Sequence, residues 1–241
     1  MKILFVETRK IKRTGYIPAF LGGGLLAGLV PAVNMAVRAE TFTAQPGSPF
    51  PILMDANWQL MAQLNILLLV CGACILYHTE YEENAIQKAE TLPLTPFRLY
   101  LGKLGIMLFS CLLPLCLEAV SLLLCCIHWF PGHPETGTLL LKGMGFELVM
   151  MLPAAAAMLV ISSMCRNMWT CLGIGVILVF MSSMLPSGNQ FLALFPFSAP
   201  YQMLHRCSDS QVLLLPALCA GEVLLFCMAE AAYHKIRRYF S

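Results

Sequence analysis

The chain is predicted to be an all-α integral membrane protein with six transmembrane helices in a single domain, residues 1–241. Hydrophobic residues make up 59% of the chain and charged residues only 12%, whereas a soluble domain carries about 25% charged residues. Mean hydropathy is +0.74. Apolar stretches of about 20 residues can cross a bilayer. They are Tyr16–Val37, Trp58–Tyr77, Leu104–Ile127, Leu139–Met164, Trp169–Leu185 and Val212–Tyr233.

The basic residues predict the orientation of these spans. With the N-terminus inside, 12 of the 15 Lys and Arg residues fall on the inner side and 3 on the outer side. Because cytoplasmic segments of membrane proteins carry the excess of Lys and Arg, both termini are predicted to be cytoplasmic. The outer residues are Arg38, Lys142 and Arg206; the inner ones are Lys2, Arg9, Lys10, Lys12, Arg13, Lys88, Arg98, Lys103, Arg166, Lys235, Arg237 and Arg238.

Three segments outside the spans have distinct patterns. Residues 1–14 mix apolar and basic side chains, which predicts an amphipathic helix on the inner membrane surface. Ala39–Asn57 contains three prolines and a glycine and is predicted to be an outer loop that is not helical throughout. Residues 187–210 are aromatic-rich and broken by Pro196 and Pro200. We predict short helices half-inserted from the outer face, with an ordinary loop as the alternative.

Three carboxylates lie inside predicted spans: Glu118, Glu147 and Glu222. The topology places all three roughly 12–15 Å below the outer end of their helices. Charged groups at this depth are costly and usually face the interior of a bundle. Two interpretations follow: a substrate path that attracts a cationic amphipathic peptide, or structural carboxylates hydrogen-bonded to neighbours such as Asn65. Glu230 is predicted to meet Lys235 or lipid headgroups.

The longest charged connection, residues 78–98, is predicted to be a cytoplasmic loop. It is acidic, carrying Glu80, Glu82, Glu83 and Glu90, and it ends in Leu92-Pro93-Leu94-Thr95-Pro96-Phe97-Arg98 before Lys103. This order resembles permeases of ABC-2 type transporters, and among them most the lantibiotic and bacitracin self-protection permeases. Phe97 departs from the small polar residue that is commoner there. A solvated acidic loop without a partner is the alternative.

The resemblance implies a bacterial cell-membrane exporter that expels a peptide antibiotic and works with separate ATPase subunits. The chain has no G-x-x-x-x-G-K-[ST] motif, so ATP and Mg²⁺ would belong to that partner. The resemblance assigns coupling to the ATPase to Glu80, Glu82, Glu83, Glu90 and Arg98. It also implies a second permease, identical or paralogous, that contacts spans one and five. Small residues there allow close helix approach: Gly24, Gly28, Gly173 and Gly175.

Other classes of protein fit the sequence less well. The net charge of +2 does not favour nucleic-acid binding. Glu82-Glu83 is similar to a motif of intramembrane proteases, but Gln87 stands where their arginine is expected and no histidine lies within a predicted span. We therefore expect no catalytic residue and no metal site. An intramembrane enzyme and a secondary transporter remain the alternatives to an ABC permease.

Overall fold

The computed structural model describes residues 11, 14–82, 96–131, 136–185 and 194–240. In these residues every regular element is a helix, which confirms the all-α prediction. The helices are α2 (Tyr16–Thr43), α3 (Pro49–Glu82), α5 (Pro96–Trp129), α6 (Thr136–Met150), α7 (Leu152–Met164), α8 (Met168–Ser183) and α9 (Asp209–Phe240), with short 3₁₀ turns η2 (Ala199–Tyr201) and η3 (Leu204–Arg206). In the described part, five stretches are long and apolar enough to cross a membrane, and α8 is a shorter apolar helix.

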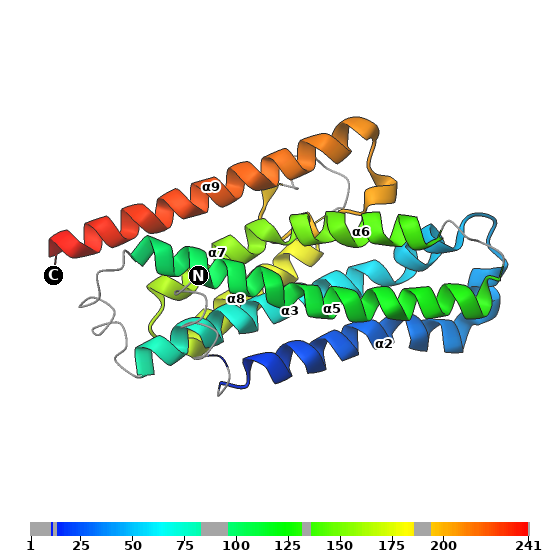
Figure 1. The fold of residues 1–241 in the computed structure, drawn as a ribbon, viewed down its shortest axis with the longest axis horizontal. Coiled ribbons are helices and arrows are strands. Elements are labelled where there is room, and N and C mark those ends of the chain that lie inside the picture. The colour runs from blue at the N-terminus through cyan, green and yellow to red at the C-terminus, as the bar shows by residue number, and fades with distance from the viewer. Residues whose placement is uncertain (1–10, 12–13, 83–95, 132–135, 186–193, 241) are drawn as a thin grey trace.

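The long helices run side by side along one axis of the molecule (Figure 1). The centre of the bundle is α3, which contacts α2, α5, α7 and α8. Its residues Met61, Ile66 and Val70 are completely buried. By contrast, α2 and α9 leave large apolar side chains such as Leu26 and Leu225 more than half exposed. An apolar outer face suits helices that border lipid.

The helices extend further than the hydropathy of the chain predicts. The prediction that Ala39–Asn57 is not helical throughout is confirmed, but the break is short: α2 continues to Thr43, α3 begins at Pro49, and only residues 44–48 are non-helical. Proline in the first turn of a helix breaks no hydrogen bond, since the first amides have no partner within the helix. Pro49 and Pro51 therefore mark the start of α3 and do not interrupt it.

The fourth predicted span, Leu139–Met164, consists of two consecutive helices in the structure. α6 ends at Met150 and α7 begins at Leu152, with a turn at Met151. Pro153 explains the break, because it has no amide hydrogen and its ring clashes with the carbonyl of the preceding turn.

The segment after α8 folds back onto α3. The indole Nε1 of Trp58 donates to the carbonyl of Pro200 at 2.9 Å. Gln59 Nε2 lies 3.4 Å from the carbonyl of Ser183, the last residue of α8. α8 therefore ends beside Gln59 of α3. Gln59 follows Pro49, the first residue of α3, by ten residues, or about 15 Å along the helix. Residues 194–206, the returning segment, pack alongside this stretch of α3. The depth of residues 194–206 in the membrane stays a prediction, and so does the side of the membrane on which each terminus lies. The amphipathic helix expected in residues 1–14 also stays a prediction, because most of those residues lie outside the described part of the chain.

Candidate functional site

The buried helix α3 presents polar side chains at three levels: Asp55, Asn65 and Glu80. At 1.5 Å per residue these lie about 15 Å and then about 22 Å apart along the helix. The total of about 37 Å exceeds the roughly 30 Å of a hydrocarbon core. Asp55 and Glu80 therefore suit the two membrane boundaries, while Asn65 suits the interior.

Glu80 forms a buried ion pair at one end of the bundle. Its Oε1 lies 2.8 Å from Nζ of Lys103, near the start of α5, and the two side chains are 10% and 2% exposed. The ammonium group also lies 4.8 Å from the centre of the Tyr77 ring. Buried charges require such partners, because each is strongly destabilised without one. The pair joins the helices on both sides of residues 83–95, which lie outside the described residues.

The predicted coupling residues occupy different environments. Glu80 is buried and paired with Lys103, and its coupling role stays a prediction. Glu82 is the last residue of α3, and Arg98 is exposed in the first turn of α5. Glu83 and Glu90 lie outside the described residues, so their coupling role stays a prediction.

A second buried carboxylate, Glu230 of α9, lies in the bundle interior. It is 0% exposed, and its Oε2 accepts a hydrogen bond of 2.7 Å from Ser163 of α7. Its Oε1 lies 3.0 Å from Nε2 of His234, one turn further along α9. The prediction that Glu230 meets Lys235 or lipid headgroups is wrong, because the side chain points toward α7. Glu230 thus ties α9 to the bundle.

The middle level holds two of the three carboxylates predicted to line a substrate path. Asn65 Nδ2 donates to Oε2 of Glu118 at 3.1 Å, so the suggested pairing of these residues is present. Glu118 and Glu147 are 0% and 1% exposed, and they lie close enough for their charges to interact. One oxygen of each carboxylate has no hydrogen-bond partner in the described part of the chain. This polar pocket of the bundle is therefore only partly satisfied by the protein itself.

The third predicted carboxylate, Glu222 of α9, is also buried, with 8% exposure. Neither of its oxygens has a hydrogen-bond partner among the described residues. Among the described residues no contact joins it to Glu118 or Glu147, so the common level of all three stays a prediction.

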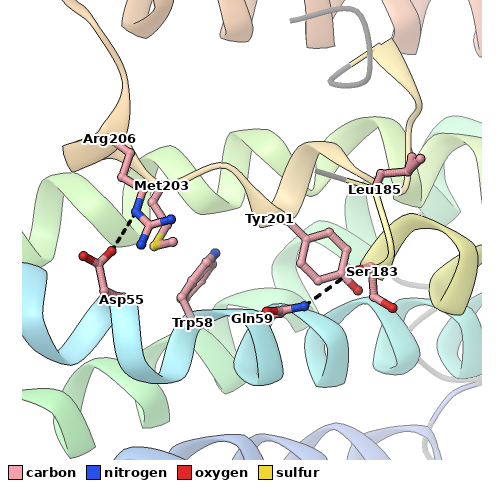
Figure 2. Close-up of a pocket in the computed structure, with 8 residues that line it drawn as sticks. All are labelled: Asp55, Trp58, Gln59, Ser183, Leu185, Tyr201, Met203 and Arg206. Carbon is pink, nitrogen blue, oxygen red and sulfur yellow. Dashed lines mark hydrogen bonds and ion pairs between the residues drawn. The ribbon is translucent and has the colours of Figure 1, made fainter. Parts of the chain in front are cut away.

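A small cavity lies at the opposite end of α3 from Glu80. Its volume is about 190 Å³, and it is enclosed by α3, the end of α8 and the returning segment. Figure 2 shows Arg206 reaching across to Asp55, with Trp58 between this pair and Tyr201. The lining residues are Asp55, Trp58, Gln59, Ser183, Leu185, Tyr201, Met203 and Arg206.

Asp55 holds the returning segment through a single oxygen atom. Arg206 Nε donates to Asp55 Oδ1 at 2.8 Å, and His205 Nε2 lies 2.7 Å from the same oxygen. The Asp55 side chain is 43% exposed, and Oδ2 makes no hydrogen bond to the described residues. The sequence analysis missed this contact, because a sequence separation of about 150 residues leaves no local signal.

Tyr201 forms the other end of the cavity. The residue is 8% exposed, and its hydroxyl has no hydrogen-bond partner among the described residues. Burial raises the pKa of Tyr201 to about 12; nearby Ser182 lowers it slightly. The hydroxyl therefore stays protonated at neutral pH, and it is a polar atom that can both donate and accept a hydrogen bond.

The four glycines predicted for a permease–permease interface divide into two groups. A Cβ at Gly24 would lie 2.8 Å from Cα of Pro114, and one at Gly28 would lie 3.2 Å from the carbonyl oxygen of Leu117. Both therefore serve the packing of α2 on α5 within one chain. Gly175 likewise faces Val70 of α3, whereas a Cβ at Gly173 would meet no atom within 4 Å. Only Gly173 is open to a second chain.

The arrangement of long apolar helices with buried, paired charges is that of a multi-pass membrane protein. A family model described as "ABC-2 family transporter protein" matches residues 3–182. The chain therefore belongs to the ABC-2 transporter family and is a permease subunit of an ABC transporter. No curated protein and no solved structure matches it. The family match ends before the returning segment and α9.

Proposed function

We propose that this chain is the membrane-spanning subunit of an ATP-driven exporter in the bacterial cell membrane, which expels a lantibiotic-like cationic peptide and so confers immunity or resistance. Two permeases, identical or paralogous, would assemble with two separate ATPase subunits that bind ATP and Mg²⁺. The observation that carries the ATP-driven part is the family membership together with the Glu80–Lys103 pair. The pair joins α3 to α5 where the predicted coupling loop connects them.

This geometry supports a simple route for coupling. An ATPase that moves residues 83–95 would act on the ends of α3 and α5 together, because their buried ion pair resists separation. α3 contacts five other α-helices, namely α2, α5, α6, α7 and α8, so its movement would reach most of the bundle. Glu82, Glu83 and Glu90 would then provide the ATPase contact, and Arg98 would flank it.

The substrate class is supported by the buried carboxylates. Glu118 and Glu147 keep oxygens without hydrogen-bond partners in the middle of the bundle, and carboxylates at such depth commonly mark a transport path. A cationic peptide side chain could complete their hydrogen bonding. Glu222 would line the same route from α9.

Affinity purification of the tagged chain from its native host in mild detergent tests this function. We expect a P-loop ATPase to co-purify, with one species of six-span permease for a homodimer or two for a heterodimer. In the reconstituted complex, E118Q with E147Q should lower the ATPase stimulation by a cationic lantibiotic-like peptide and spare basal activity. A stable, folded preparation without any ATPase would overturn the exporter assignment. Equal loss of basal and stimulated activity would assign the carboxylates a structural role.

A further inference from the structure

We infer that the cavity between α3 and the returning segment is a binding site for a primary ammonium group, with Asp55 as its counter-ion. The inference rests on the proposed function for the source of that ammonium, a lysine side chain or the amino terminus of a cationic amphipathic peptide. The site is separate from Glu118 and Glu147, because Asp55 precedes Asn65 by about 15 Å along α3.

The contacts of Asp55 leave one of its two oxygens for a further donor. Both protein partners, Arg206 and His205, bind Oδ1, and this leaves Oδ2 without a partner among the described residues. The Asp55 side chain is 43% exposed, so a ligand can reach it without unfolding of the segment. An ammonium group needs up to three acceptors. Gln59 also lines the cavity, one turn further along α3 and beyond Trp58 (Figure 2), and its Oε1 accepts no hydrogen bond from the described residues.

The remaining walls suit the alkyl chain that carries an ammonium. Trp58, Met203 and Leu185 supply apolar surface, and the buried hydroxyl of Tyr201 supplies one further unpartnered polar atom. Aromatic rings also attract cations through their faces. The volume of about 190 Å³ is below the roughly 300–1,000 Å³ of pockets that enclose a drug-sized ligand. The cavity therefore takes one side chain of a larger molecule.

Arg206 has a distinctive role in this interpretation. Its guanidinium occupies the same carboxylate as the incoming ammonium and partly neutralises it, so it competes with the ligand. Removal of Asp55 and removal of Arg206 should then change ligand affinity in opposite directions. A purely structural ion pair predicts the same direction for both, because either substitution breaks the same contact between α3 and the returning segment.

Binding to the purified full-length chain in phosphatidylcholine nanodiscs separates these cases. The probe is a fluorescent amphipathic peptide of lysine and leucine, and the control peptide has the same sequence with every lysine and the amino terminus acetylated. We expect D55N to weaken binding of the lysine peptide about fivefold and R206Q to tighten it severalfold, as for a partly exposed ion pair. Neither variant should change binding of the acetylated peptide.

Several outcomes would overturn the inference. Equal weakening by D55N and R206Q would make the pair structural, and equal binding of both peptides by the wild-type chain would exclude ammonium recognition. The gain expected for R206Q cannot arise from misfolding, so it tests the site even if D55N does not fold. The same binding measurement in nanodiscs that contain phosphatidylethanolamine tests a lipid source of the ammonium. If that lipid displaces the peptide from the wild-type chain but not from D55N, a lipid headgroup also binds at the site. Binding requires no ATPase, so failure here is distinct from failure of the proposed export function.

Discussion

At the scale of single residues, the bundle is defined by charges that are buried in pairs. Glu80 with Lys103 connects α3 to α5, and Glu230 with Ser163 connects α9 to α7, while His234 contacts Glu230 from the next turn of α9. Such contacts are costly to form but highly directional, because a misaligned partner leaves a charge without compensation. They therefore fix the relative position of helices whose apolar surfaces alone would permit sliding.

Substitution of Lys103 by methionine tests how much the Glu80–Lys103 ion pair stabilises the folded chain. K103M leaves Glu80 buried without its cation, and we expect a loss of about 3–5 kcal/mol in the free energy of unfolding. The double variant E80Q/K103M should recover most of that loss, because two neutral side chains need no counter-charge. Thermal unfolding of the purified chain in detergent measures both. A double variant as unstable as K103M would show that packing of the lysine stem matters more than the ion pair.

The residues of the candidate site could be predicted only in part. Intramembrane position alone identifies Glu118 and Glu147, because a carboxylate in an apolar stretch is exceptional. The burial of Glu80 could not be predicted, since it lies among other acidic residues and its partner Lys103 follows 23 residues later. Asp55 and Arg206 are further apart still, and only the fold brings them together.

At the scale of helices, hydropathy predicted which segments are helical but not where they end. α3 was expected over Trp58–Tyr77 and spans Pro49–Glu82. The difference arises because hydropathy reports the lipid-exposed length, whereas backbone hydrogen bonding continues past the membrane boundary. α8, expected over Trp169–Leu185, covers nearly that range as Met168–Ser183. Its short length leaves space that the returning segment fills.

The contact between α2 and α5 depends on a glycine that adjoins backbone. A Cβ at Gly24 would meet Cα of Pro114 at 2.8 Å, and backbone cannot move aside as a flexible side chain can. We expect G24A to destabilise the chain by about 1–3 kcal/mol through forced separation of the helices. G22A is the matched control on the same helix, because a Cβ there meets no atom within 4 Å.

The comparison of the two variants separates packing from helix propensity. Alanine favours helix over glycine by up to about 1 kcal/mol, and both substitutions share this gain. Unfolding of both in the same detergent therefore isolates the effect of the α2–α5 contact. Equal stability of G24A and G22A would mean that α2 shifts without cost.

At the scale of the whole molecule, the exposed faces differ in their composition. α8 presents Trp169, Ile177 and Phe180, which are 76%, 60% and 49% exposed, around the open Gly173. Gly24 and Gly28 pack against α5 within the chain and are not open to a second chain. Gly173 of α8 is open, so a second helix can approach closely there. A permease pair would therefore meet at α8 and leave α9 toward lipid.

Replacement of Gly173 by leucine tests this assembly. G173L should raise the dissociation constant of the permease pair about tenfold, because a bulky side chain keeps the facing helix at a distance; this corresponds to about 1.4 kcal/mol. G221L on α9 is the control, since Gly221 is equally open, with no atom within 4 Å of its Cβ position. Photobleaching-step counts of labelled chains in dilute liposomes measure the paired fraction. If G221L separates the pair and G173L does not, the permease–permease interface lies on α9. If neither substitution separates the pair, both glycines face lipid and the permeases meet through another surface.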